Sequence, residues 1–297
     1  MTTPASDPEE TLLAKASRRR ATQIMIVFAA LFVIVPFLFW RGTWFGRTLT
    51  EDELGKYLAD TEKPRHVQHA LVQIAERIGR NDTTVERWYP QVLRLASSPV
   101  PEVRVLVAWV LGADTHSEEF HQALRVLLED GDMMVRRNAA LSLSRFGDPS
   151  GKPELRNMLL PFTVHAPASG TLRYRLEEGN TVDQGTLLAR IETSAGEKEV
   201  RSPLPGTLER KLLADGASVS EGEEILVLSP RAEHAWEALR AFYLVGQEED
   251  LPEVERFARG ADYDMPEKIQ QQALLTAQEI RRRASAIRER KGTSRSP

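Results

Sequence analysis

The stretch EDGDMMVRRNAALSLSRFGD, residues 129–148, decides the fold of much of the chain, because an earlier stretch has the same pattern. That earlier stretch is SSPVPEVRVLVAWVLGAD, residues 97–114. Positions 103 and 135 both begin a Val-Arg pair, so the period is 32 residues, and small or apolar residues follow each pair at helical spacing. A fixed period in the thirties is typical of an α-solenoid, in which each helical pair buries its apolar face against its neighbours.

Further segments extend the helical pattern toward both ends of the chain. EKPRHVQHALVQIAERIG (62–79) and MPEKIQQQALLTAQEI (265–280) each place apolar residues on one face, and HAWEALRAFYLVG (234–246) with LPEVERFARG (251–260) supplies preceding helices. The segments resemble HEAT repeats of the short variety, on the strength of Asp132, Val135, Arg136, Ala139, Ala140 and Leu143. The resemblance implies HEAT-like repeats over 60–161 and 231–290. An unrelated helical bundle is the alternative, since helical amphipathicity is common.

Between these helical parts the sequence changes to two aligned β-like halves. They are VHAPASGTLRYRLEEGNTVDQGTLLARIET (164–193) and VRSPLPGTLERKLLADGASVSEGEEILVLS (200–229), and their glycines fall at matching positions. Short β-branched and leucine runs between glycine turns favour strands. Two such units pair most readily into a small sandwich or barrel. We therefore predict a β domain over 162–230.

The shared pattern A-P-x-x-G-T-L resembles that of the biotinyl/lipoyl carrier fold, which also occurs in membrane fusion proteins of transport systems. In lipoyl domains a lysine at the hairpin tip carries the cofactor. Here the hairpin reads IETSAGEKEV (191–200), with Ser194 at the aspartate position and Ala195 at the lysine position. Alanine has no nitrogen to which biotin or lipoate can be amide-linked. Lys198 is the remaining alternative, although strand alternation places it on the opposite face from the tip. We expect no cofactor.

Residues 24–40, IMIVFAALFVIVPFLFW, carry no charge, and residues 21–23 extend the run toward the length that a membrane-spanning helix needs. Lys15 and the arginines at 18–20 precede it, so the positive-inside rule predicts a cytoplasmic tail over 1–20 and a single-pass anchor over 21–40. A linker (41–59) and an extracytoplasmic, periplasmic bulk of the chain would follow, in the inner membrane. A cleaved signal peptide is the competitor, but no A-x-A-like site follows the run. A buried core helix is the other alternative.

Composition and motifs exclude several classes of chemistry. The chain has 297 residues, a formal net charge of −4 and no cysteine, which excludes disulfides, thiolate metal sites and cysteine nucleophiles and gives no reason to expect nucleic-acid binding. No P-loop, dinucleotide-binding glycine run or G-x-S-x-G motif is present. His66 and His69 are three residues apart, but no H-E-x-x-H spacing occurs. We therefore predict neither an enzyme nor a metal site.

The predicted fold class is multidomain α plus β: a single transmembrane helix, a HEAT-like α-solenoid and a small all-β biotinyl/lipoyl-like sandwich barrel, ending in a basic tail (291–297). The predicted function is a membrane-anchored, non-enzymatic scaffold or adaptor, a protein–protein interaction subunit of an envelope complex. Its partners would be the lipid bilayer and other envelope or membrane proteins. Arg104 and Arg136 are the candidate interaction residues, unless they tie repeats together internally. The alternatives are a periplasmic adaptor of an export system and a biotin- or lipoate-carrying enzyme subunit.

Overall fold

The computed structural model describes residues 32, 47–260 and 265–293, the last five by their backbone only. The chain divides into two units, residues 1–56 and 57–297. Helix α2 (Glu51–Ala59), which crosses the boundary between the two units, begins with a reciprocal cap. The Thr50 backbone N–H donates to Glu53 Oε2 at 3.0 Å, and the Glu53 N–H donates to Thr50 Oγ1 at 3.3 Å. This arrangement satisfies two of the backbone donors that a helix N-terminus leaves free.

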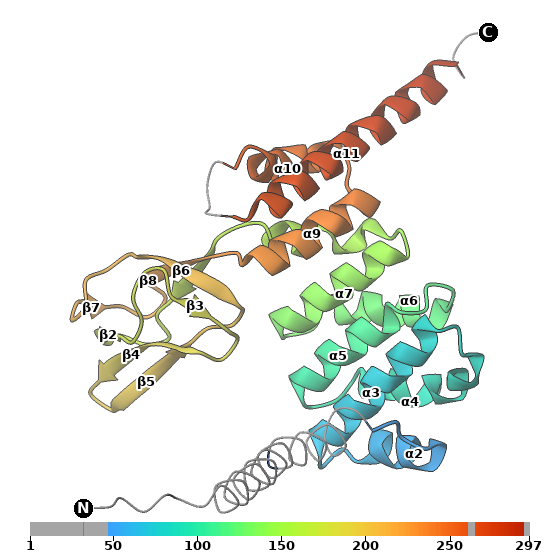
Figure 1. Cartoon of the computed structure of the whole chain (residues 1–297). Coiled ribbons are helices and arrows are strands. Elements are labelled where there is room, and N and C mark those ends of the chain that lie inside the picture. The colour runs from blue at the N-terminus through green and yellow to red at the C-terminus, as the bar shows by residue number, and fades with distance from the viewer. Residues whose placement is uncertain (1–31, 33–46, 261–264, 294–297) are drawn as a thin grey trace, which may run out of the picture. The chain divides into compact units, whose positions relative to one another are not determined.

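The helices of the second unit form two layers. In one layer each helix packs on the next, in the order α3 (Pro64–Gly79), α5 (Pro101–Leu111), α7 (Met133–Arg145), α9 (Ala232–Val245) and α11 (Glu267–Thr293) (Figure 1). The other layer contains η2 (Thr83–Trp88), α4 (Tyr89–Leu95), α6 (Glu118–Leu127), η3 (Pro149–Gly151), α8 (Lys152–Asn157), η4 (Glu248–Asp250) and α10 (Leu251–Ala258). This is the stacking expected of helical repeats.

Small residues bring successive helices of the first layer close together. The Ser142 hydroxyl of α7 donates a hydrogen bond to the Ala108 carbonyl of α5 at 2.7 Å. A Cβ atom added at Gly112 would lie 2.3 Å from Ser142 Oγ, so the contact requires glycine at this position. The starts of α6 and α7 are set by side-chain caps from Ser117 and Asp132.

The β domain consists of two four-stranded antiparallel sheets. The first has the order β1-β8-β6-β3 and the second β5-β4-β2-β7. The strands are β1 (Phe162–His165), β2 (Gly170–Tyr174), β3 (Thr181–Val182), β4 (Leu187–Thr193), β5 (Gly196–Arg201), β6 (Gly206–Lys211), β7 (Ser218–Val219) and β8 (Glu224–Ser229). The core between the sheets includes Leu172, Leu188, Ile191, Leu208 and Ile225, none of them exposed.

The two β halves interlock. The short strand β3 of the first half pairs with β6 of the second, and the short strand β7 of the second half pairs with β2 of the first. Gly185 and Gly222 occupy equivalent turns with φ of 82° and 81°, in the left-handed region that favours glycine. The aligned glycines of the sequence therefore mark equivalent turns of two similar halves.

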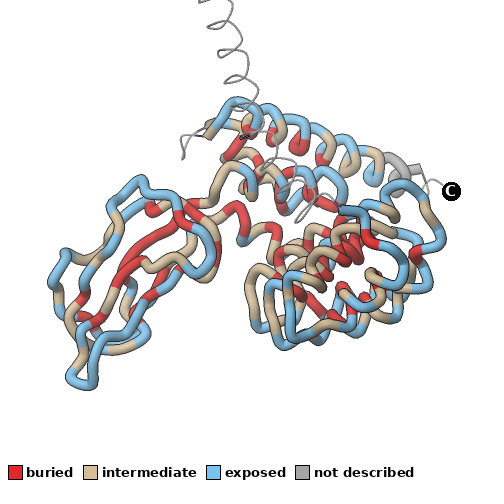
Figure 2. The backbone as a smooth tube through the Cα atoms, turned by 60° about the horizontal axis from the view of Figure 1, so that its bottom comes forward, coloured by how far each residue is buried: buried red, intermediate tan, exposed pale blue. Residues whose placement is uncertain are grey.

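One apolar core continues from the helices before the β domain to those after it. Leu155, Met158 and Leu159 precede the strands in sequence, and they pack in one cluster with Leu239 and Phe242 of α9. Figure 2 shows buried residues both between the strands and between the helices. The β domain is thus an insertion, and the helical stack resumes where the chain returns from it.

The predicted fold class is wrong on two points. The strands form two open sheets instead of a closed barrel, because the two-residue strands β3 and β7 have too few backbone groups to close the sheet edges. In the part of the chain that the structure describes, no helix is long and apolar enough to cross a membrane. The predicted single-pass location in the inner membrane is therefore not supported. Residues 21–40, the predicted anchor, lie outside the described residues apart from Phe32, as do the tail at 1–20 and residues 294–297.

Candidate interaction surface

Arg104 of α5, predicted as an interaction residue, contacts the chain itself. Its Nε and Nη2 atoms donate to the two carboxylate oxygens of Asp130 at 2.7 and 2.8 Å, and its Nη1 donates to the Ser98 carbonyl at 2.7 Å. The side chain is only 16% exposed. The hydrogen bonds from Arg104 hold the pKa of the Asp130 carboxyl below its ordinary value, despite partial burial. The geometry is that of an internal brace between neighbouring repeats.

Arg136 makes the same kind of contact one repeat later. Its Nε donates to Glu154 Oε1 at 2.9 Å, and its Nη1 donates to the Asp130 carbonyl at 2.8 Å. In both copies of the Val-Arg pair, the guanidinium group of the arginine therefore makes two contacts. It donates to a backbone carbonyl in the loop before its own helix, and it pairs with an acidic residue further along the chain. The structure favours the alternative in which both arginines tie repeats together, and a partner-binding surface has to be sought elsewhere.

A third brace is centred on the buried carboxylate of Asp148. Arg125 Nε donates to it at 2.8 Å, and His121 Nε2 lies 2.7 Å from it. Burial alone would raise the pKa of the Asp148 carboxyl, but hydrogen bonds from Ser150, Arg125 and His121 outweigh burial, so its pKa lies far below the ordinary value. Among the described residues, no group of three or more histidines and acids is arranged to hold a metal ion.

The hairpin between β4 and β5 presents no amine at its tip. Ser194 and Ala195 form the turn, and the Thr193 hydroxyl closes it by donating to the Gly196 carbonyl at 2.7 Å. Ala195 is exposed. Lys198 lies along β5, opposite Ile191 in the strand register and away from the turn. Ala195, which the sequence resemblance aligned with a carrier lysine, therefore presents a methyl group to solvent.

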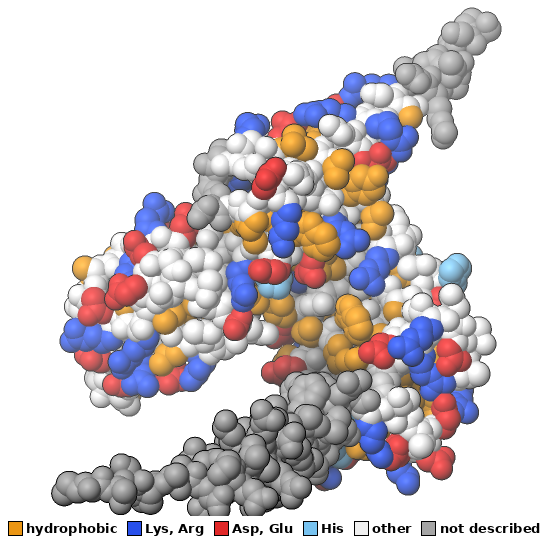
Figure 3. Space-filling model, viewed as in Figure 1, with side chains coloured by type: hydrophobic (Ala, Val, Ile, Leu, Met, Phe, Trp, Pro, Cys, Tyr) orange, Lys and Arg blue, Asp and Glu red, His pale blue; other side chains and the backbone are white. Residues whose placement is uncertain are grey.

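Most of the exposed large apolar side chains lie on the last two helices of the first layer. Among the described residues from 47 to 288, seven large hydrophobic residues are exposed, and five of them are in α9 or α11. These are Tyr243, Leu244, Leu274, Leu275 and Ile287. On this part of the molecule, hydrophobic side chains lie among lysine and arginine side chains (Figure 3). Terminal repeats normally present a polar outer face to water, so these five residues are a departure from the rule.

Helix α9 also carries two aromatic residues beside its buried face: Trp236, which is half-buried against the helical core, and the exposed Tyr243. Trp236, Arg240 and Tyr243 are spaced i, i+4 and i+7, which places them along one side of the helix. The Arg240 guanidinium lies over the Trp236 ring, 4.6 Å from its centroid. We call Trp236 and Arg240, together with the five exposed apolar residues, the α9–α11 patch. The sequence analysis did not predict this patch, because it treated residues 234–246 as a helix of the repeat core. The pattern that could have indicated it is the pair Trp236 and Tyr243, seven residues apart. These two residues lie beside the buried residues of the helix, Ala235, Ala238, Leu239 and Phe242.

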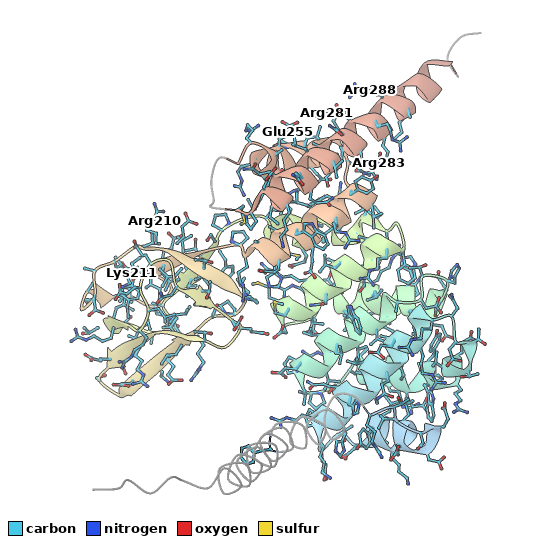
Figure 4. The ribbon with its side chains drawn as sticks, viewed as in Figure 1. Arg210, Lys211, Glu255, Arg281, Arg283 and Arg288 are labelled. Carbon is cyan, nitrogen blue, oxygen red and sulfur yellow. The ribbon has the colours of Figure 1, made fainter. Side chains whose placement is uncertain are left out.

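Arginines of α11 fasten that helix to its neighbours (Figure 4). Arg283 donates to the Phe242 carbonyl at 3.2 Å and to the Leu244 carbonyl, so it caps the C-terminus of α9. Arg281 pairs with Glu255 of α10, and Arg288 pairs with Glu248 of η4. These two side chains nevertheless remain more than half exposed. Cationic groups therefore border the exposed apolar residues.

Comparison with known proteins supports the helical part only. Residues 89–161 match HEAT repeats, so the chain contains a HEAT-like helical region, as predicted. No curated protein matches the chain. A single-chain, multi-domain long-chain acyl-CoA carboxylase is 20% identical, with a TM-score of 0.23, over 34% of this chain and 11% of that chain. A putative succinylglutamate desuccinylase/aspartoacylase family protein from Shewanella amazonensis is 21% identical, with a TM-score of 0.21, over 23% of this chain and 20% of that chain. At such scores neither likeness carries an argument.

Proposed function

We propose that this protein is a non-enzymatic scaffold or adaptor that binds a protein partner through the α9–α11 patch. The observation that carries the proposal is the exposure of five large apolar residues, Tyr243, Leu244 and Leu275 among them, on two packed helices. Tryptophan, tyrosine and arginine are the residues that dominate binding energy in protein interfaces, and the patch contains all three. Helical repeats supply the extended and rigid surface on which such a patch can be held.

We further infer that the β domain is a biotinyl/lipoyl-like domain that has lost its carrier function and serves as a rigid block. Two interlocked halves, each with an equivalent glycine turn, support this inference. The exposed Ala195 at the hairpin tip supports the loss of the carrier role. Such a domain adds a second surface to the scaffold and performs no chemistry.

The patch is tested by placing a charge in it. Leu275→Asp and Tyr243→Asp should each reduce recovery of the partner at least tenfold, because an interface centre tolerates no unpaired charge. The measurement is quantitative mass spectrometry of proteins that co-purify with the tagged full chain, followed by binding assays with the partner identified. Helix content and thermal midpoint should stay at the wild-type values, since Leu275 is 54% exposed.

Val126→Asp is the matched control for the patch. Val126 is 73% exposed but belongs to α6, in the other layer of helices. It should retain the partner at the wild-type level. Equal retention in Leu275→Asp, Tyr243→Asp and Val126→Asp would contradict the proposal, and so would equal loss in all three.

Restoring the tip lysine tests the inference on the β domain. Ala195→Lys should leave the free energy of unfolding within about 0.5 kcal/mol of wild type, because the site is an exposed turn. Incubation with lipoate ligase or biotin ligase, the cofactor and ATP should then add one cofactor mass to the variant. Wild type, which retains Lys198, should gain none. A folded Ala195→Lys variant that neither ligase modifies would count against the biotinyl/lipoyl likeness of the hairpin.

A further inference from the structure

The same hydrogen bond joins two pairs of neighbouring helices in the first layer. Ser142 of α7 donates from its hydroxyl to the carbonyl of Ala108 in α5 at 2.7 Å. Thr276 of α11 donates in the same way to the carbonyl of Leu239 in α9 at 2.9 Å. Ala108 and Leu239 are fully buried, because the following helix covers them. The side of a first-layer helix that carries this residue is therefore its contact side toward the next helix.

The corresponding side of α11 is open to solvent. Ala140 lies two residues before Ser142 and is fully buried in the core that contains α9. Leu274 lies two residues before Thr276, at the equivalent position, yet it is 49% exposed. Helix α11 packs against α9 and α10 and is the last helix of the first layer (Figure 1). Leu274 therefore stands at a helix-packing position that remains uncovered in the described part of the chain.

The uncovered side of α11 is self-complementary. Its exposed residues are spaced three or four apart, which places them on one side of the helix. They are Glu267, Gln271, Leu274, Leu275, Gln278 and Arg282. In an antiparallel pair of such helices centred between the two leucines, leucine meets leucine, glutamine meets glutamine, and Glu267 meets Arg282. A two-fold interface requires this relation, since residue i contacts residue j and residue j contacts residue i.

We propose that two copies of this chain pair antiparallel through this side of α11, around a two-fold axis between Leu274 and Leu275. The charges favour a second copy as the partner, because each end of the contact side carries the charge opposite to that of the other end. Arg282 is 70% exposed and Glu267 is exposed in the first turn, so both charges are accessible. The inference rests on the proposed function, since it names the partner of the α11 residues of the α9–α11 patch.

One pair of like charges falls in the same register without opposing the pairing. Lys268 and Arg281 of the second copy lie at matching heights along the two helices. A helix turns by about 100° per residue, so these two positions are about 140° apart, at opposite borders of the contact side. Arg281 is moreover paired with Glu255 of α10. Glu267 and Arg282 are only about 60° apart, near the middle of that side.

Charge reversal tests the antiparallel register. Sedimentation equilibrium of the wild-type full chain should give twice the chain mass of 33.4 kDa at high concentration. Glu267→Arg sets arginine against arginine at both ends of the interface, and Arg282→Glu sets glutamate against glutamate. Each variant should raise the dissociation constant of the dimer at least tenfold, because like charges oppose association. An equimolar mixture of the two variants should associate again, because every contact then joins opposite charges.

Arg80→Glu is the matched control for these variants. It makes the same change of charge at the end of α3, at a side chain that is 76% exposed, and it should keep the wild-type dissociation constant. Association through the uncharged run at residues 24–40 would be equal in all variants. The proposal is overturned by a monomeric wild type, by charge-reversed variants that associate like wild type, or by a mixture that does not associate.

The outcomes also separate this inference from the proposed function. A monomeric wild type whose recovery of another protein still falls in Leu275→Asp would overturn the dimer and leave the proposed function in place. A dimeric wild type whose charge-reversed variants pair only when mixed would support the dimer. If Leu275→Asp, Tyr243→Asp and Val126→Asp then recovered other proteins equally, the proposed function alone would be contradicted.

Discussion

Replacing Asp250 by alanine should lower the free energy of unfolding by about 3 kcal/mol, because it removes the buried acid that pairs with Arg156 and leaves Lys152 with only the exposed Glu249. The Asp250 side chain is fully buried, and its carboxylate lies 2.5 Å from Arg156 Nη2 and 3.0 Å from Lys152 Nζ. It also accepts a hydrogen bond from the Gln247 backbone N–H at 2.9 Å. These contacts join α8, which precedes the β domain, to η4, which follows it.

Urea unfolding of wild type and Asp250→Ala, monitored by far-ultraviolet circular dichroism, checks this prediction. Glu249→Ala is the control, since Glu249 also pairs with Lys152, at 2.5 Å, but is 59% exposed. The exposed pair should contribute less than about 1 kcal/mol. If Asp250→Ala proved as stable as Glu249→Ala, the helices on the two sides of the insertion would not depend on this buried carboxylate.

The same carboxylate predicts a pH dependence of stability. Burial alone would raise the pKa of Asp250, but hydrogen bonds from Gln247, Lys152 and Arg156 outweigh burial and leave the pKa below its ordinary value. Its contribution is therefore fully present above the unfolded-state pKa, about 3.9, and is lost as the pH falls through the folded-state pKa. The difference in thermal midpoint between wild type and Asp250→Asn should be constant from pH 7 to 5 and shrink below pH 4. A difference that grows on acidification would contradict the assigned direction.

Charge reversal at Arg104 should also lower the free energy of unfolding strongly. Arg104→Glu removes the two-pronged contact with Asp130 and sets two carboxylates against each other, at an expected loss of about 3 kcal/mol. Helix content near the thermal midpoint should fall, and any partner should be lost only to the extent that the protein unfolds. Arg94→Glu makes the same change of charge at an exposed residue of α4, and its stability should stay within about 0.5 kcal/mol of wild type.

A charge swap distinguishes the brace from a binding residue. Arg104→Asp combined with Asp130→Arg restores opposite charges across the same gap, so the double variant should recover about 1 kcal/mol or more of the sum of the two single losses. A stable Arg104→Glu variant that releases a partner would contradict the internal role and return Arg104 to the interaction surface.

The sequence by itself determined the elements that depend on local pattern. The 32-residue recurrence of the Val-Arg pair predicted a HEAT-like region, and residues 89–161 match HEAT repeats. The pattern is visible in the sequence because each repeat must carry an apolar face that it buries against the next repeat. Matching glycines such as Gly185 and Gly222 indicated two similar β halves, since a turn with positive φ selects glycine wherever it occurs. The prediction of a closed barrel failed, because sheet closure depends on strand length and pairing partners that periodicity does not encode.

Only the tertiary structure decided which charged and aromatic residues are free to act. Arg104 and Arg240 look alike in sequence, yet one braces neighbouring repeats while the other lies over Trp236 on the α9–α11 patch. Arg137 adjoins Arg136 in the chain, but helix geometry turns it toward the β domain while Arg136 meets Glu154. Burial and pairing arise between residues distant in the chain, as between Arg156 and Asp250 on either side of the inserted β domain. A pattern of neighbouring residues carries no record of such contacts.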